Sequence, residues 1–441
     1  MKRGPQQREN KLLSKKGLLE TIQKSFRTLK NNGKHKDLKI SPFDCLMSAT
    51  AMFNLKSPSL LAFDQATKEE PLCQNLKNLY GVEHVPCDTY MREMLDEVDP
   101  QALRQSYLAI FNKLQRGNFL EQFKFFGGYL LACDGTGVFE SEKVHCKNCC
   151  EKRHRDGRIT YYHQLLAGAI VKPDVAQVIP LCPEPIYKHD GADKNDCEIN
   201  AANRFLDNLK CEHPRIQATC TFDALFANAP FINRLRERKL DYIIVAKSGN
   251  NPSLFEWISG IKLREIQLDV NGNLYKFRYI NGIPLNNTKD APEVNFFECE
   301  ATEVDGKRTL VKKFSWITSH KITDSKIHTL MLGGRAKWKI ENETFNTLKN
   351  QGYQFEHNFG HGKKYLHTIF ALLMVLSFLI DQVQEASDGL FRAALQKVKT
   401  RRALWEKIKI FFYGFLIESW DHLFKAIVFG YKHTKIELNT S

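Results

Sequence analysis

Residues 129–137 read YLLACDGTG, a short apolar run followed by a polar, glycine-rich stretch. Such a run predicts a buried strand that ends in a turn, with Asp134 at the point where the strand ends. The run from Ile216 to Phe222 repeats the pattern and ends at Asp223. A strand end holds a side chain rigidly beside an open sheet edge, so both carboxylates are candidate catalytic groups. Aspartate also ends strands simply because it favours turns.

A third carboxylate lies in the segment 336–350, which the residue pattern predicts to be a helix. Its apolar residues recur at helical spacing: Trp338, Phe345 and Leu348. Glu341 falls in the same stripe, whereas Glu343 is predicted on the opposite, solvated side. A glutamate that faces a core is costly unless it is paired or binds a metal ion, so Glu341 is the predicted third member. The alternative is a buried ion pair between Glu341 and a neighbouring cation, Arg335 or Lys337.

Three carboxylates on neighbouring elements suit hard, oxygen-seeking cations such as Mg²⁺ or Mn²⁺. Two such ions about 4 Å apart can activate a water molecule or a 3′-hydroxyl on one side and stabilise the leaving oxygen on the other. Asp134, Asp223 and Glu341 are therefore predicted to bind two metal ions and to catalyse phosphodiester hydrolysis and strand transfer.

The segments around these carboxylates predict an α/β fold. Between 126 and 250 the elements follow the order β-β-β-α-β-α-β, which is typical of a mixed sheet with helices packed on it. Alternating residues in 270–320 predict antiparallel strands, and 41–125 and the chain from Lys364 onward are predicted to be helical. Predicted helix starts combine a capping side chain with proline, at Ser41-Pro42, Ser57-Pro58 and Asp99-Pro100.

Three longer runs carry a resemblance to a known family. They read LLACDGTGVF (130–139), ATCTFDALFANAPFINRLRERKLDYIIVAK (218–247) and RAKWKIENETFNTLKNQGYQFEHNFGHGKKYL (335–366). They resemble the three catalytic blocks of bacterial insertion-sequence DDE transposases, most of all the group whose third block reads Arg-x-x-Trp-x-Ile-Glu-Asn. KNDCEINAANRFL (194–206) is similar to the first core helix of that group. The resemblance covers roughly residues 40–385.

The resemblance implies a ribonuclease H-like core with a β-rich insertion between the second aspartate and the glutamate. The gaps agree with it, since 223 − 134 = 89 and 341 − 223 = 118, and the longer gap holds the predicted β segment. It also implies an enzyme that binds the inverted ends of its own element in double-stranded DNA, cuts them and joins them to target DNA. Because two ends are handled together, a homodimer on DNA is expected.

The chain departs from the family around the glutamate. Many relatives carry a Tyr…Arg…Glu…Lys signature, whereas here Gly334 stands in the tyrosine place, Lys337 in the arginine place and Leu348 in the lysine place. Lys349 follows one residue later, and Arg335 is a substitute donor for phosphate. The predicted DNA contacts are Lys194, Arg204, Lys247, Arg335, Lys337 and Lys349; a solvated surface is the alternative for each.

The net charge of +14 favours a polyanionic partner, nucleic acid before a membrane. Residues 1–40 hold twelve Lys or Arg and three Asp or Glu, so this segment is predicted to be a basic arm that contacts phosphates or a solubilising tail. No secretory signal follows Met1, and the apolar run from Ile369 to Ile380 is too short to span a bilayer. The protein is expected in the bacterial cytoplasm in association with DNA, and its twelve cysteines are expected to be reduced thiols.

A Cys-x-x-Cys pair, Cys146 and Cys149, follows the first aspartate, with His145, His154 and His163 nearby. Such a pair with a later histidine can bind a structural Zn²⁺ ion. The alternative is a loop of reduced cysteines beside the active site.

The predicted organisation has six parts: a basic arm (1–40), a helical DNA-binding region (41–125), the first part of the catalytic core (126–250), a β-rich insertion (251–325), the end of the core with the glutamate helix (326–385) and a helical C-terminal region (386–441). The main alternatives to a transposase are a catalytically inactive, transposase-derived DNA-binding protein and a metal-dependent nuclease without strand transfer.

Overall fold

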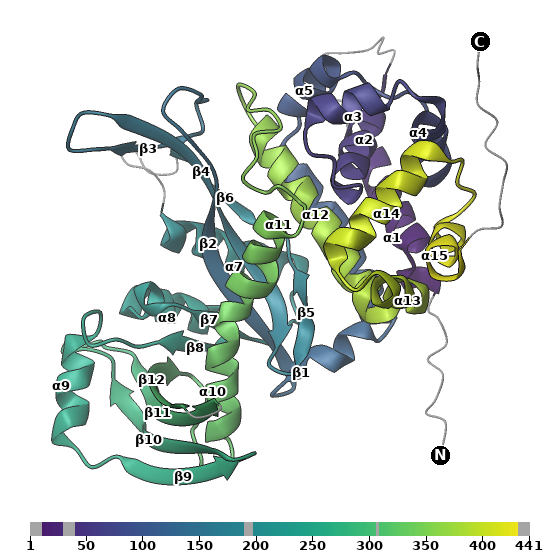
Figure 1. The fold of residues 1–441 in the computed structure, drawn as a ribbon. Helices are drawn as coiled ribbons and strands as arrows, with labels where there is room; N and C mark the ends of the chain where they lie inside the picture. Colours follow the sequence, from purple (N-terminus) through teal and green to yellow (C-terminus); the bar gives the residue numbers. More distant parts are fainter. Residues whose placement is uncertain (1–10, 30–39, 189–196, 306–307, 431–441) are drawn as a thin grey trace, which may run out of the picture. The chain divides into compact units, whose positions relative to one another are not determined.

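The computed structural model describes residues 11–29, 40–188, 197–305 and 308–430 (Figure 1). The chain folds into two compact units. A helical unit contains residues 1–119 and 347–441, and an α/β unit contains residues 120–346. The helical regions predicted before and after the catalytic core are thus parts of one unit, and that unit also takes in the segment 347–385 that was predicted to end the core.

Ten α-helices among the described residues lie wholly within the helical unit. They are α1 (Lys15–Arg27), α2 (Pro42–Asn54), α3 (Leu60–Ala66), α4 (Glu70–Asn75), α5 (Asp88–Asp96), α6 (Arg104–Arg116), α12 (Leu366–Ser387), α13 (Gly389–Val398), α14 (Arg401–Gly414) and α15 (Trp420–Phe429). The expected capping residues begin two of the helical segments: Ser41 caps α2, and Asp99 caps the short turn Pro100–Leu103 before α6. The start predicted at Ser57-Pro58 lies two residues too early, because Ser59 caps α3.

Part of the predicted basic arm is a packed helix. α1 lies within residues 1–40, and its apolar face, including Leu18 and Ile22, is buried against α6. The alternative of a solubilising tail does not hold for 15–27, because a regular apolar stripe among the lysines makes this segment an amphipathic helix. The remaining basic residues of 1–10 and 30–39 lie outside the described residues.

α12 is the central helix of the helical unit and packs against α2. It is the one helix among the described residues that is long and apolar enough to cross a membrane, but its most apolar stretch is completely buried, as in the core of a globular unit. It also carries a buried charge: Asp381 Oδ2 lies 2.7 Å from Lys56 Nζ, and Asp381 Oδ1 lies 3.6 Å from Lys15 Nζ. All three side chains are at most 3% exposed. Burial lowers the pKa of Lys56 to about 8, although Asp381 opposes the shift.

The α/β unit is built on one sheet. Its strands are β1 (Lys124–Phe125), β2 (Gly128–Ser141), β3 (Cys150–Arg153), β4 (Ile159–Lys172), β5 (Val175–Pro180), β6 (Glu184–Ile186), β7 (Ala218–Phe222), β8 (Asp241–Val245), β9 (Arg264–Val270), β10 (Asn273–Pro284), β11 (Glu293–Asp305) and β12 (Arg308–Thr318). Its helices are α7 (Glu198–Glu212), α8 (Ala229–Glu237), α9 (Pro252–Gly260) and α10 (Ile327–Arg335). The predicted α/β class and mixed sheet are confirmed.

The sheet order is β3-β4-β2-β7-β8-β12-β11-β10-β9, with β5 and β6 paired to β4. β2 and β4 are antiparallel, whereas β2, β7 and β8 run parallel to one another. The predicted antiparallel strands of the insertion are confirmed, and they extend the same sheet because β12 pairs with β8. The insertion is therefore continuous with the strands that carry the aspartates.

The predicted helix 336–350 is only partly regular. After α10 the chain forms a 3-10 turn (Ala336–Trp338), a π-helical turn (Ile340–Phe345) and the short α11 (Asn346–Asn350). A π-turn is wider than an α-turn, so side chains two residues apart do not point where a regular helix would send them.

Candidate active site

Asp134 lies inside β2 rather than at its end. β2 continues to Ser141 because it stays paired with β4, in a ladder that sets Asp134 opposite Ala167. The turn predicted at 134–137 is therefore wrong. Ladder pairing satisfies the backbone groups of this stretch and outweighs the turn preference of its glycines.

The register of β2 and β7 sets the two predicted aspartates level with each other. The ladder of these parallel neighbours ends with Ala132 beside Thr221. Asp134 and Asp223 both follow that pair by two residues (134 − 132 = 2 and 223 − 221 = 2). Side chains along a strand repeat their direction every second residue. The two carboxylates are therefore expected side by side, at the same height along the neighbouring strands.

Asp223 ends β7, as predicted. It begins the short turn Ala224–Phe226, and its Oδ1 accepts a hydrogen bond from the backbone N–H of Leu225 (2.9 Å). This turn leads β7 away from the sheet while β2 continues, which leaves the side of β2 beyond Asp134 without a strand partner from β7.

Glu341 lies on the π-turn and is exposed, so the prediction that it faces the core is wrong. Trp338, the first member of the predicted apolar stripe, is 53% exposed, whereas Ile340 and Thr344 are buried. Glu341 nevertheless lies near Asp134. Burial is the main cause that raises the pKa of Asp134, and the charge of Glu341 raises it further. An exposed carboxylate at the rim suits a site that must admit a large substrate.

Lys337 is the cation that contacts the predicted site. Its Nζ lies 2.7 Å from Asp134 Oδ2, and both side chains are nearly buried, with 14% and 13% exposed. This contact lowers the pKa of Asp134 and opposes the effect of burial. The predicted alternative paired Lys337 with Glu341; in the structure the partner of Lys337 is Asp134.

A fourth carboxylate, Glu198 at the start of α7, was missed in the sequence. A Cβ placed on Gly135 would lie 2.2 Å from Glu198 Oε1, so the absent side chain of Gly135 makes room for this carboxylate. Burial raises the pKa of Glu198, and the charges of Asp134 and Asp223 raise it further. Three acidic groups are therefore close enough to influence one another. The sequence signal was weak: an acidic first residue in a helix, which the helix dipole alone explains.

Asp134, Asp223 and Glu341 are the candidate ligands for hard metal ions, and Asp134 has a cation beside it. Among the described residues, no group made only of these acidic side chains is close enough to share one ion. Lys337 neutralises Asp134, and metal binding there would require the ammonium group to move away. Oxygen ligands of this kind would nonetheless favour Mg²⁺ or Mn²⁺ over softer ions.

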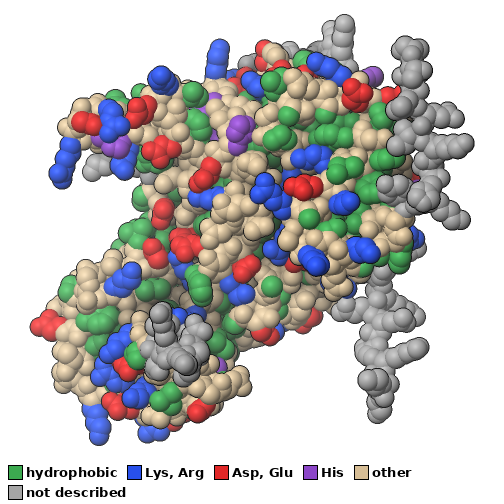
Figure 2. Space-filling view, in the orientation of Figure 1, with side chains coloured by type: hydrophobic (Ala, Val, Ile, Leu, Met, Phe, Trp, Pro, Cys, Tyr) green, Lys and Arg blue, Asp and Glu red, His purple; other side chains and the backbone are tan. Residues whose placement is uncertain are grey.

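A pocket of about 480 Å³ adjoins Lys337 in the α/β unit. Aromatic side chains and cations line it: Phe314, Trp316, Trp338, Lys247, Lys312, Lys313, Arg335 and Lys337. Arg335 lies over the ring of Phe314, with 5.3 Å between the guanidinium carbon and the ring centroid. Flat apolar surfaces beside cations are suited to nucleotides, whose bases stack and whose phosphates are anionic. Figure 2 shows acidic and basic side chains interspersed over the visible face.

Gly334 also lines this pocket and explains one departure from the transposase signature. A Cβ on Gly334 would lie 2.6 Å from Trp316 Nε1. The indole ring of Trp316 fills the space that a side chain at 334 would need, so the tyrosine of the signature has no room here.

The other predicted DNA contacts differ in their surroundings. Lys194 lies outside the described residues. Arg204 is 32% exposed and donates a hydrogen bond to Glu184, which is buried, so its guanidinium already has a carboxylate partner within the unit. Lys349, in the helical unit, lies 2.7 Å from Glu356. Lys247 is exposed.

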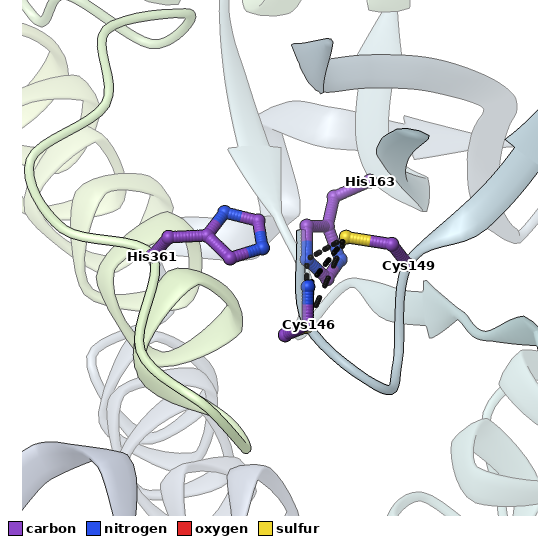
Figure 3. A group of neighbouring side chains, drawn as sticks. All are labelled: Cys146, Cys149, His163 and His361. Atoms are coloured by element: carbon purple, nitrogen blue, oxygen red, sulfur yellow. Dashed lines mark hydrogen bonds between the residues drawn. The ribbon is translucent and has the colours of Figure 1, made fainter. Parts of the chain in front are cut away.

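The predicted sulfur ligands lie together in the α/β unit. Cys146, Cys149 and His163 form a group that could hold a metal ion (Figure 3). Of the other nearby histidines, His145 stacks on a tyrosine ring and His154 bonds to a threonine hydroxyl. His361, also drawn in Figure 3, belongs to the helical unit.

No protein-family model matches the chain, and no curated protein sequence matches it.

Proposed function

We propose that the chain is a DDE-type DNA transposase whose catalytic carboxylates are Asp134, Asp223 and Glu341. The observation that carries the proposal is the level placement of Asp134 and Asp223 on adjacent parallel strands, with Glu341 close enough to raise the pKa of Asp134. Three antiparallel strands, a helix, and two parallel strands separated by a helix also agree with the expected ribonuclease H-like core. The aromatic and basic pocket beside Lys337 supports a nucleic-acid substrate.

In this proposal Asp134, Asp223 and Glu341 would hold two Mg²⁺ or Mn²⁺ ions, and bound ions would supply activation of the attacking hydroxyl and charge stabilisation at the leaving oxygen. The residues of the chain position these groups. Lys337 stands in the arginine place of the signature, so its ammonium group would contact a DNA phosphate. The sulfur pair Cys146 and Cys149 would take Zn²⁺ in a structural role, because thiolates prefer a softer ion. The enzyme acts as a homodimer on its two DNA ends.

A second candidate is a DNA-binding protein without catalysis. One observation favours it: the ammonium group of Lys337 lies 2.7 Å from Asp134 Oδ2, beside the oxygen that a metal ion would need. The two candidates differ in whether DNA is cut and not in whether it is bound.

The deciding experiment measures cleavage and strand transfer on duplex DNA that carries the inverted repeat flanking the gene, with Mg²⁺ or Mn²⁺. Asp134→Asn, Asp223→Asn and Glu341→Gln each remove one ligand charge at nearly constant shape, so cleavage is expected to fall at least about 1,000-fold while DNA binding persists. Glu343→Gln, two residues from Glu341, is the matched control and is expected to cut normally. Asp134→Asn or Asp223→Asn cutting at near wild-type rate would show that the assignment is wrong, and a wild-type chain that binds but never cuts would establish the second candidate.

A further inference from the structure

The three ligand atoms of the sulfur group have the spacing of a zinc site. Cys146 Sγ and Cys149 Sγ lie 3.8 Å apart, and His163 Nε2 lies 3.5 Å and 3.4 Å from them. Zn–S bonds of about 2.3 Å and a Zn–N bond of about 2.0 Å at tetrahedral angles require edges of about 3.8 Å and about 3.5 Å. The three atoms therefore form one face of a tetrahedron of the size that Zn²⁺ needs. A disulfide would require the sulfurs to be about 2 Å apart.

The local backbone presents both sulfurs to the same side. Cys146 and Cys149 are joined by a tight turn in which the Cys149 N–H donates to the Cys146 carbonyl oxygen (3.2 Å). The Cys146 N–H in turn donates to Cys149 Sγ (3.4 Å). These two backbone contacts hold the sulfurs of the pair on one side of the turn. Cys149 and His163 are buried, and this protects such a site from exchange with solvent.

We infer that Cys146, Cys149 and His163 are three ligands of one Zn²⁺ ion, and that this ion ties the loop before β3 to β4, the strand that pairs with β2. The inference adds His163 and a structural consequence to the zinc part of the proposed function. It rests on the geometry of the three side chains and does not depend on DNA cleavage. Two thiolates and an imidazole select zinc over Mg²⁺, and one position of the tetrahedron remains for a further donor.

The consequence follows from the place of His163 on β4. His163 pairs with Phe139 of β2, and it lies four residues along β4 from Ala167, the partner of Asp134. At about 3.3 Å per residue, His163 is about 13 Å from the level of that carboxylate. The ladder between β2 and β4 has an irregularity between Gly137 and Phe139, so the strand pair is least regular between the two positions. A bound ion would fix the β4 side of this irregularity and stabilise the strand that carries Asp134.

The test is the metal content of the purified full-length chain, measured by mass spectrometry of the elements, together with thermal melting. About one zinc per chain is expected for the wild type, and removal of zinc by a chelator should lower the melting temperature until zinc is restored. Cys146→Ser and His163→Asn should lose the zinc. Cys150→Ser is the matched control: Cys150 is buried next to Cys149, but its Sγ donates to the Ile186 carbonyl, so its loss should leave zinc in place.

His163→Cys serves as the conservative variant, because a thiolate can replace the imidazole, and it should recover zinc that His163→Asn lacks. A wild-type chain that holds no zinc, either as purified or after incubation with zinc, would overturn the inference. So would full zinc content in Cys146→Ser or in His163→Asn. Asp134→Asn should keep its zinc, so loss of cleavage in that variant concerns the proposed function alone.

Discussion

Replacing Gly135 with alanine tests whether Glu198 belongs to the active site. The new Cβ would lie 2.2 Å from Oε1 and 2.5 Å from Cδ of Glu198. An ordinary contact is about 3.4 Å or more, so the carboxylate must retreat by about 1 Å. A misplacement of that size at a catalytic group costs on the order of 100-fold in rate. Overpacking a rigid core costs about 1–3 kcal/mol, but here the displaced group is the end of a flexible, part-exposed side chain, so a loss of stability below about 1 kcal/mol is expected.

Gly137→Ala is the control. Gly137 lies two residues further along the same strand, and a Cβ there meets nothing within 4 Å. Both variants add one methyl group to the same strand, and only Gly135→Ala presses on Glu198. Metal-dependent cleavage and thermal melting of both proteins give the comparison. Gly135→Ala is expected to cut about 100-fold more slowly than Gly137→Ala at a similar melting temperature.

A double-variant cycle decides whether the effect passes through Glu198. If the alanine acts by displacing this carboxylate, then adding Gly135→Ala to a Glu198→Ala background should change the rate little, because the group to be displaced is already gone. Equal rates for Gly135→Ala and Gly137→Ala would refute the reasoning. A full 100-fold effect of Gly135→Ala in the absence of the Glu198 carboxylate would also refute it, since the methyl group would then act on something else.

Two further predictions concern charges. Lys337→Gln removes the ammonium group that lowers the pKa of Asp134, so the pKa of Asp134 should rise further. Because metal binds the ionised carboxylate, the acid limb of the pH–rate profile of Mn²⁺-dependent cleavage should move to higher pH. An acid limb that does not move would contradict this. Lys339→Gln, whose ammonium group donates to a backbone carbonyl, should leave the limb in place. Asp381→Asn strands two buried ammonium groups and should lower the free energy of unfolding in urea by about 3–5 kcal/mol. Asp174→Asn, at an exposed position, should change it by less than about 0.5 kcal/mol, and a similarly small loss for Asp381→Asn would show that the buried pair adds little.

The parts of the fold that sequence could predict are those set by local pattern. The strands before Asp134 and Asp223 are buried as predicted. Five apolar residues in a row precede Asp134, which fits a strand of a sheet covered on both faces. The helical flanks and the antiparallel strands of the insertion also follow from side-chain period. The side-chain pattern does not show which strands pair with each other. No feature of the sequence near β12 shows that it pairs with β8 and so makes the insertion part of the same sheet.

The errors at the site have physical causes. The glycines after Asp134 favour a turn, but pairing with β4 over the length of β2 overrides that preference. The face assigned to Glu341 assumed a rotation of about 100° per residue, and the π-turn does not keep it. Glu198 was missed because its relation to Gly135 is a contact across 63 residues of sequence (198 − 135 = 63). For Asp134 and Glu198 a long-range contact decides the arrangement, whereas for Glu341 the local helix geometry departs from the assumed period.

The two proposed metal sites lie on paired strands, β2 and β4, and this affects how chelation experiments must be interpreted. β2 carries Asp134 for a hard ion, and β4 carries His163 for a soft one. A strong chelator would remove both ions, so loss of cleavage on chelation would not by itself identify the catalytic metal. The ligand sets are chemically distinct, because Mg²⁺ does not take thiolates. Restoring Mg²⁺ alone should therefore return activity only to protein that has kept its zinc, whereas protein stripped of zinc should need both ions.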